Sequence, residues 1–246
     1  MSLDIKTIFD NDEIAAEKRQ SHIVTDIKEA VRDQNRVNIY IDNKFFCSLD
    51  ISQVVDFHLK IGLKLEEDKL AELKHASEFG KLYTRALEYL MSRPHSKKEI
   101  QDYLKRKTLD RKVRVKSKQT GEYKTVDKKG FDKSLIEPVM RRLEERGYID
   151  DARFARLWVE NRNIRKGSSS KKLRTELAQK GISSNIIDEI MSENLRDEKE
   201  ELRKVIAKKR AKYDDLKLTQ YLLRQGFNYS DISEELSIFD SSSDPA

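Results

Sequence analysis

The stretch LAQKGISSNII, residues 177–187, decides the fold because the chain repeats its pattern. The same order recurs in LLRQGFNYSDI at residues 222–232, and in a divided form in LKRK at residues 104–107 and GFDKSLI at residues 130–136. Each copy has a leucine, then a Lys or Gln three residues later. A glycine, an apolar residue and a capping residue follow, and an isoleucine stands six positions after the glycine. We predict that the glycine ends one helix in a left-handed conformation and that Asp, Ser or Asn caps the next helix.

Three copies predict a tandem helical array, because neighbouring units of such arrays bury each other's apolar faces. From Tyr83 onward the apolar residues follow the helical period almost throughout. The alternative is that three helix corners look alike by chance, but the match extends to both sides of each corner. We therefore expect a mainly α-helical fold that is an elongated, tandem helical array, with repeats at residues 81–149, 150–195 and 196–240.

Predicted helix caps support this division. Ser96-Lys97-Lys98-Glu99 has the spacing of a capping box, in which the serine accepts from a backbone amide and the glutamate reaches back. Asp150 is placed to cap the helix that carries Phe154 and Trp158, and Ser169 or Ser170 to cap a later one.

Residues 108–129 interrupt the first copy and do not have a helical pattern. Residues 112–116, Lys-Val-Arg-Val-Lys, alternate with period two, Gln119-Thr120-Gly121 is a turn signal, and residues 123–126 can return as a second strand. This pattern predicts a β-hairpin inserted into the helical body. Residues 105–129 carry 11 basic and 3 acidic side chains, a net charge of +8.

Residues 21–80 are predicted to form a small N-terminal module of antiparallel β-strands and helices. The expected strands contain Ile23-Thr25-Ile27, Val37-Ile39-Ile41 and Phe45-Phe46-Cys47, with a turn at Asp42-Asn43. Helices are expected from Ser52 through Leu59 and from about Glu66 into Ala76. Residues 1–20 are predicted to be a flexible lead, and residues 241–246 a disordered tail.

The charge is unevenly distributed along the 246 residues. Charged residues make up 38% of the chain, against about 25% in typical globular domains, which suits an architecture with much surface for its volume. Residues 1–80 carry a net charge of −5, and residues 81–246 carry +11. A basic remainder favours a polyanionic partner, with solubility alone as the alternative.

Several function classes lack sequence support. The four histidines are scattered and Cys47 is the single cysteine, so no metal-site spacing and no intramolecular disulfide is expected. Glycine-rich nucleotide-binding motifs and Gly-x-Ser-x-Gly are absent. The sequence shows neither a run of about 18 apolar residues nor a secretory signal. We therefore expect no catalytic residues, no cofactor, no metal, no membrane contact and a cytoplasmic location.

Three basic clusters form the candidate binding surface. The predicted hairpin would carry a row of cations on one face, about 6–7 Å apart at the rise of a strand. Such a row can follow a phosphate backbone, with salt-sensitive and sequence-independent contacts, or line an acidic protein groove. Around residues 167–170, free amides at a helix start could hold a phosphate. For each cluster the alternative is ordinary solvated side chains. The candidates are Lys112, Arg114, Lys116 and Lys118 in the row with Lys124 on the returning strand, Arg162, Arg165, Lys166, Lys171, Lys172 and Arg174 in the second cluster, and Lys208, Lys209 and Arg210 in the third.

From about Tyr83 to Ile232 the chain resembles the RecX family, bacterial modulators of the RecA recombinase. The N-terminal segment of this chain is similar to the N-terminal part of longer members, on the evidence of residues 36–42, Phe45 and residues 59–62. Insertion 108–129 is unusual in the family, and the loop at residues 167–170 lacks the aromatic residue and further glycine often found there. The resemblance rests on Ala86-Leu87 to Arg93, Ser96-x-x-Glu99, Tyr103-Leu104, Leu143, Gly147-Tyr148-Ile149-Asp150-Asp151, Phe154-Ala155, Gly167, Leu173 to Ile182, and Tyr221 to Phe227 with Tyr229.

The resemblance implies three tandem three-helix repeats that form a curved body. It also implies a non-enzymatic, DNA-binding regulator of homologous recombination, DNA repair and the SOS response. It would dock in the groove of a RecA–single-stranded DNA filament and mostly inhibit the filament's ATPase, strand-exchange and coprotease activities. The expected partners are the RecA filament and single-stranded DNA, with non-specific duplex DNA as a further partner, and the expected state is a monomer. One alternative is a stand-alone nucleic-acid-binding helical module whose corners act as helix-turn-helix units without RecA. Another, an enzyme acting on nucleic acid, has no support beyond charge.

Overall fold

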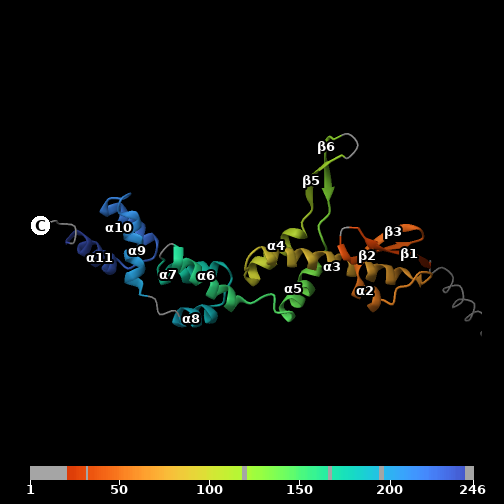
Figure 1. Ribbon diagram of the computed structural model, residues 1–246, viewed down its shortest axis with the longest axis horizontal. Coiled ribbons are helices and arrows are strands. Elements are labelled where there is room, and N and C mark those ends of the chain that lie inside the picture. Colours follow the sequence, from red (N-terminus) through yellow and green to blue (C-terminus); the bar gives the residue numbers. More distant parts are fainter. Residues whose placement is uncertain (1–20, 32, 118–120, 166–167, 194–196, 242–246) are drawn as a thin grey trace, which may run out of the picture. The chain divides into compact units, whose positions relative to one another are not determined.

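A computed structural model describes residues 21–31, 33–117, 121–165, 168–193 and 197–241 (Figure 1). The predicted lead at residues 1–20 and most of the predicted tail lie outside these ranges. The chain divides into two units, each with its own internal packing. One runs to Leu87 and includes Lys107–Leu135, and the other comprises Glu88–Arg106 and the chain from Ile136. Helices dominate, as the sequence predicted, and a small sheet precedes them.

The N-terminal sheet contains the three predicted strands and one short addition. The turn between its second and third strands falls at Asp42 and Asn43, whose φ angles are 50° and 62°. Positive φ at both central positions is the hairpin geometry whose twist matches that of the strands. The antiparallel order is β3-β2-β1-β4, with β1 at His22–Ala30, β2 at Asp33–Ile41, β3 at Lys44–Asp50 and β4 at Lys64–Leu65.

The predicted alternation of the first strand fails at its start. A β-bulge lies between Val24 and Asp26 in the pairing of β1 with β2, and it changes which side chains face inward. Val24 is therefore 0% exposed, whereas Ile23 is 40% exposed. Beyond the bulge the prediction holds, because Ile27 packs against the core of this unit.

One helix extends well beyond its predicted end at about Ala76. Helix α2 (Ile51–Asp56) is followed by α3 (Glu67–Ser92), which continues past that point. Gly80 lies inside α3, and a Cβ there would lie 3.1 Å from the Asp50 carboxylate and 3.2 Å from the Arg36 guanidinium. These two groups form an ion pair of 2.9 Å. The predicted end at about Ala76 was wrong: the helix continues through Gly80, where the absence of a side chain permits this close packing.

The remaining helices follow the predicted repeat. In the second and third repeats the conserved spacing of the motif corresponds to buried positions: Leu177, Ile182 and Ile187 share one core, and the matching Leu222, Phe227 and Ile232 share another. The helices are α4 (Lys97–Lys107), α5 (Ile136–Glu145) after a 3₁₀ turn at Lys133–Leu135, α6 (Asp151–Arg165), α7 (Ser170–Gln179), α8 (Ser184–Glu193), α9 (Glu198–Lys209), α10 (Asp215–Arg224) and α11 (Tyr229–Ser241).

The glycine of each corner has one of two roles. Gly181 and Gly226 have φ angles of 82° and 89° and end their helices in the predicted left-handed conformation. Gly130 does not have a positive φ, and a Cβ there would overlap the carbonyl of Thr108. The insertion separates Gly130 from the end of α4, so this glycine lets the two ends of the insertion approach each other. The left-handed prediction was wrong at this corner.

The insertion is the predicted β-hairpin, formed by β5 (Arg111–Lys116) and β6 (Tyr123–Lys128). It stands apart from α3 in Figure 1, and its strand residues other than Val113 are exposed. Its base is closed by two hydrogen bonds. The amide of Gly130 donates to Asp110 Oδ1 at 2.8 Å, and the amide of Phe131 donates to the carbonyl of Lys107 at 3.1 Å.

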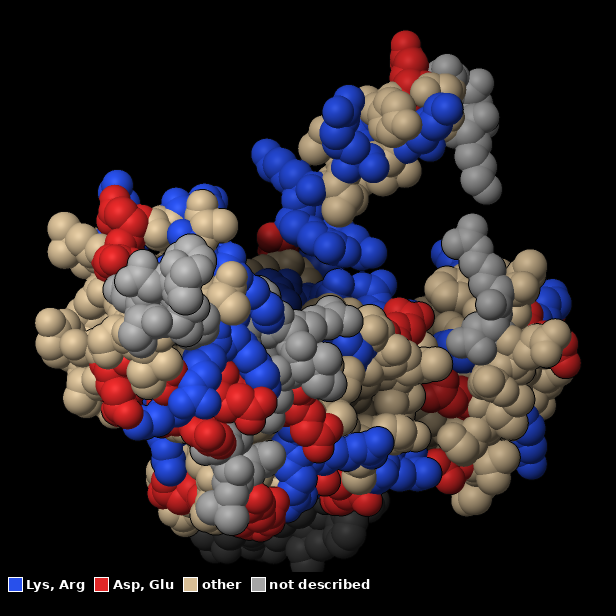
Figure 2. Space-filling model, turned by 60° about the vertical axis from the view of Figure 1, so that its left-hand side comes forward, with Lys and Arg blue, Asp and Glu red and all other residues tan. Residues whose placement is uncertain are grey.

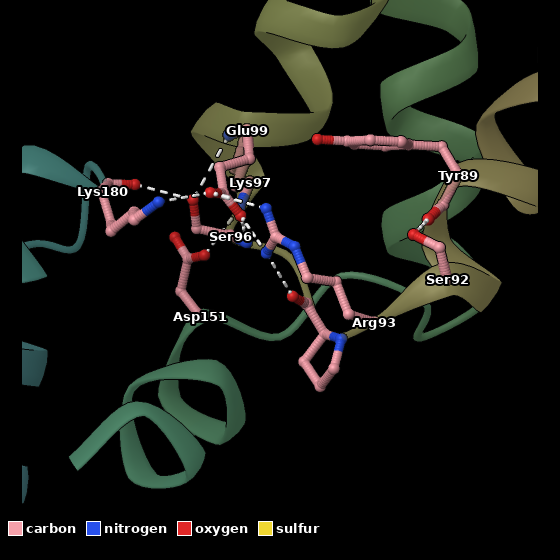
Figure 3. A network of polar contacts seen from close by, with 9 residues as sticks. Tyr89, Ser92, Arg93, Ser96, Lys97, Glu99, Asp151 and Lys180 are labelled. Atoms are coloured by element: carbon pink, nitrogen blue, oxygen red, sulfur yellow. Dashed lines mark hydrogen bonds and ion pairs between the residues drawn. The ribbon is translucent and has the colours of Figure 1, made fainter. Parts of the chain in front are cut away.

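Two buried serines join successive repeats. Ser96 caps α4 as predicted, and its hydroxyl also donates to the carbonyl of Lys180 at 2.7 Å. Ser169 caps α7, and its hydroxyl donates to the carbonyl of Gln225 at 2.6 Å. Figure 3 shows the first joint, where Glu99 accepts from Arg93 and Lys180. The start of one repeat's middle helix is thus bonded to the end of the next repeat's middle helix.

Candidate nucleic-acid interface

The strand pairing gives the hairpin two different faces. Directly paired residues of an antiparallel ladder point to the same side, and successive residues of a strand alternate. Arg114 pairs with Thr125, and Val113 pairs with Val126. The side that we name the cationic face carries Lys112, Arg114, Lys116, Tyr123, Thr125 and Asp127, and the side that we name the valine face carries Arg111, Val113, Val115, Lys124, Val126 and Lys128.

Three members of the predicted row of cations, Lys112, Arg114 and Lys116, therefore lie on one face. Lys112, Arg114 and Lys116 are all exposed, and Figure 2 shows Lys and Arg side chains along this hairpin. Lys124 lies on the valine face, and Lys118 lies outside the described residues. Within the described ranges, neither Lys112 nor Lys116 forms an ion pair, although Asp127 is directly opposite Lys112. Their positive charge remains available to an external anion.

Tyr123 is the side chain of this face that the sequence reasoning missed. The Arg114 guanidinium lies 5.2 Å from the centre of the Tyr123 ring, within the range of a cation–π contact. Lys116 is its direct cross-strand partner. The register, counted back from the turn at Gly121, could have identified it, because that count places Tyr123 opposite a cation.

The valine face stabilises the hairpin. Val113 is half-buried opposite Val126, and Val115 follows on the same side. Cross-strand pairs of β-branched residues contribute about 0.2–1 kcal/mol each, so this side supplies apolar contacts that a bare charged loop would lack. The cationic face has no pair of β-branched residues in its register.

Two residues of the second basic cluster have partners within the protein. The Lys172 ammonium donates to the side chain of Gln225, and Arg174 pairs with Asp188. Lys171 is exposed. Arg162 and Arg165 belong to α6, but their side chains are outside the described part of the chain, as is all of Lys166.

The predicted phosphate position at the start of α7 is filled by the chain itself. The amide of Lys172 donates to Ser169 Oγ at 3.1 Å, and the amide of Ser170 donates to a carboxylate oxygen of Glu198 at 3.2 Å. A carboxylate at a helix N-terminus is stabilised as a phosphate would be. Two of the first amides of this helix, those of Ser170 and Lys172, therefore already have acceptors inside the protein.

The third cluster packs on aromatic rings. Lys209 lies 5.6 Å from the ring centre of Tyr221, and Lys212 lies 5.8 Å from that of Tyr213. The two rings stack with their centres 5.7 Å apart. Arg210 lies 3.9 Å from a carboxylate oxygen of Asp215, and Lys208 is exposed. Most of these cations thus have contacts inside the third repeat.

Other kinds of site have no counterpart among the described residues. Over those ranges, His, Cys, Asp and Glu side chains do not gather in groups of three or more that could hold a metal ion. The helices that the structure describes include none with the length and apolar character needed to cross a membrane. The cationic face of the hairpin is the candidate site that combines exposure with uncompensated charge.

Comparisons with known proteins agree with this fold. Residues 22–66 match the model of the regulatory protein RecX N-terminal domain, and residues 150–191 match that of the RecX second three-helix domain. The regulatory protein RecX of Bacillus licheniformis is 30% identical over 229 residues, covering 90% of this chain and 79% of that protein. That of Clostridium acetobutylicum is 28% identical over 229 residues, covering 88% and 96%.

A solved structure supports the fold alone. A crystal structure of regulatory protein RecX aligns with a TM-score of 0.65 at 22% identity, and it covers 88% of this chain and 99% of that one.

Proposed function

This chain belongs to the RecX family of regulatory proteins, and from that premise we propose that it regulates RecA by binding the RecA–single-stranded DNA filament. The observation that carries the proposal is the cationic face, where Lys112, Arg114 and Lys116 stand in a row on an exposed hairpin. A filament that holds single-stranded DNA offers a continuous polyanion to such a row. Release of condensed counterions then favours association, and the association weakens as salt rises.

The proposed mode of action is occupancy without catalysis. A protein held in the filament groove excludes the DNA and protein substrates that must enter that groove, and it thereby lowers the filament's activities. The repeats supply a scaffold whose units are bonded in series through Ser96 and Ser169. Exposed cations on other elements, such as Lys171, would add contacts beyond the hairpin.

The stand-alone module is the competing explanation. In a DNA-reading helix-turn-helix unit, the second helix presents polar side chains to base edges. Here the helices after the second and third corners, α8 and α11, contain acidic residues but neither Lys nor Arg, and each turns its motif isoleucine, Ile187 or Ile232, into a core. This observation supports a structural role for the corners.

Imaging of RecA filaments assembled on single-stranded DNA, with and without the protein, tests the proposal. We expect the protein to decorate the filaments and to shorten them at stoichiometric ratios, with less effect at raised salt. Filaments that keep their length and carry no added density would contradict the proposal. Sequence-dependent binding to duplex DNA without any response to RecA would support the stand-alone module.

A further inference from the structure

Tyr123 is a largely exposed aromatic side chain that contributes little buried surface to the fold. It is the single aromatic residue of segment 105–129, and 60% of it is exposed. An aromatic side chain stabilises a fold chiefly by burying its large apolar surface, and Tyr123 buries little. The apolar contacts that hold the hairpin together lie on the opposite side, between Val113 and Val126.

The surroundings of Tyr123 combine an aromatic ring with cations. Arg114 packs on the ring at 5.2 Å, and Lys116 is the direct cross-strand neighbour. Lys112 continues the row on the same face. Surfaces that bind single-stranded nucleic acids combine a positively charged track for the backbone with aromatic side chains on which bases stack. Both components occur together here on one face of one hairpin.

We infer that the cationic face binds single-stranded DNA directly, with an unpaired base stacked on Tyr123 and with Lys112 and Lys116 on the flanking phosphates. The inference deepens the proposed function, on which it rests, by naming the component of the filament that the hairpin contacts. Duplex DNA fits this face less well, because each base of a duplex is already stacked on its neighbours and exposes no ring face to Tyr123.

The test measures binding of the full chain to a fluorescently labelled oligothymidylate by anisotropy over a series of salt concentrations, without recombinase. Tyr123→Ala should lower the affinity about tenfold, as loss of one stacked base does. Its salt dependence should stay unchanged, because no charge is removed. Tyr123→Phe should keep the affinity, because the ring remains.

The cations should have the complementary effect. Replacing Lys112 and Lys116 with Ala should reduce the slope of log affinity against log salt by about 1.4, since each phosphate contact on a single strand contributes about 0.7. The double substitution Arg111→Ala with Lys128→Ala removes the same charge from the valine face of the same strands. This matched control should keep the wild-type slope.

Three results would overturn the inference: wild-type affinity for Tyr123→Ala, an equal loss of affinity in the matched control, or a preference for duplex over single-stranded DNA. These results are distinguishable from failure of the proposed function. If wild-type protein shortens RecA filaments while Tyr123→Ala binds DNA normally, the stacking inference fails alone. If Tyr123→Ala loses binding while the wild type leaves RecA filaments unchanged, the proposed function fails alone.

Discussion

Single atoms decide how two repeats meet at Gly226. A Cβ there would lie 2.6 Å from the Ser169 hydroxyl that donates to Gln225. The sequence predicted both the left-handed glycine and the serine cap, because each follows from a local pattern. It did not predict the hydrogen bond from Ser169 to the carbonyl of Gln225, because these two residues are 56 positions apart in the chain. Local chemistry is readable from sequence, and the partner of a distant hydroxyl is not.

Gly226→Ala should therefore destabilise the protein more than an equivalent change elsewhere. The substitution strains a φ of 89° and also displaces the Ser169 hydroxyl, so we expect a loss of about 2–3 kcal/mol in the free energy of unfolding. Gly147→Ala is the control, because its φ of 69° is also unfavourable for alanine but a Cβ there meets nothing within 4 Å. We expect this variant to lose about 1 kcal/mol in the free energy of unfolding. Urea unfolding measures both, and equal losses would contradict the account of the joint.

Glu99 should make the stability of the other joint, between Ser96 and Lys180, depend on pH. Burial raises the pKa of this carboxyl, but hydrogen bonds and charges from Arg93 and Lys180 outweigh burial and hold the pKa at about 2, below the ordinary 4.5. The folded state thus binds fewer protons than the unfolded state between these values. The stabilisation is complete above about pH 4.5 and is lost as the pH falls toward 2. Chemical unfolding at pH 5 and pH 3 should show a smaller decline for Glu99→Gln than for wild type; identical declines would contradict this.

At the scale of whole elements, the hairpin shows what a period can and cannot predict. The alternation in residues 112–116 predicted the hairpin and its row of cations, and both are present. The assignment of Tyr123 and Lys124 to opposite faces needed the register, which depends on the turn. Similarly, the sequence around Gly80 does not reveal why a glycine stands inside α3, because the Arg36–Asp50 ion pair packed against it comes from a distant part of the chain.

The hairpin should be dispensable for folding. Its strands are almost entirely exposed, and its ends are already close, since Gly130 bonds to Asp110 at 2.8 Å. Replacing residues 111–128 with two glycines should therefore leave the melting temperature within a few degrees of wild type, while affinity for single-stranded DNA falls. Differential scanning calorimetry checks the first expectation. A broad or much lower transition would mean that the hairpin is part of the fold.

For the molecule as a whole, the uneven distribution of charge is the main basis for expecting a polyanionic partner. A net charge of −5 over residues 1–80 and +11 over the remainder pointed to a polyanionic partner. The structure reduces the set of cations available to such a partner, because Lys172, Arg174 and Lys209 have partners inside the protein. Composition could not reveal these pairings, since they depend on tertiary contacts. The curved, elongated body and the residue limits of the repeats as domains stay predictions.

The most direct test of regulation through the cationic face is the rate of ATP hydrolysis by RecA on single-stranded DNA. We predict that stoichiometric wild-type protein lowers this rate, that the double variant Lys112→Ala with Lys116→Ala lowers it less, and that the matched double variant Arg111→Ala with Lys128→Ala acts as wild type. An unchanged rate with the wild-type protein, or equal effects of the two double variants, would contradict the account.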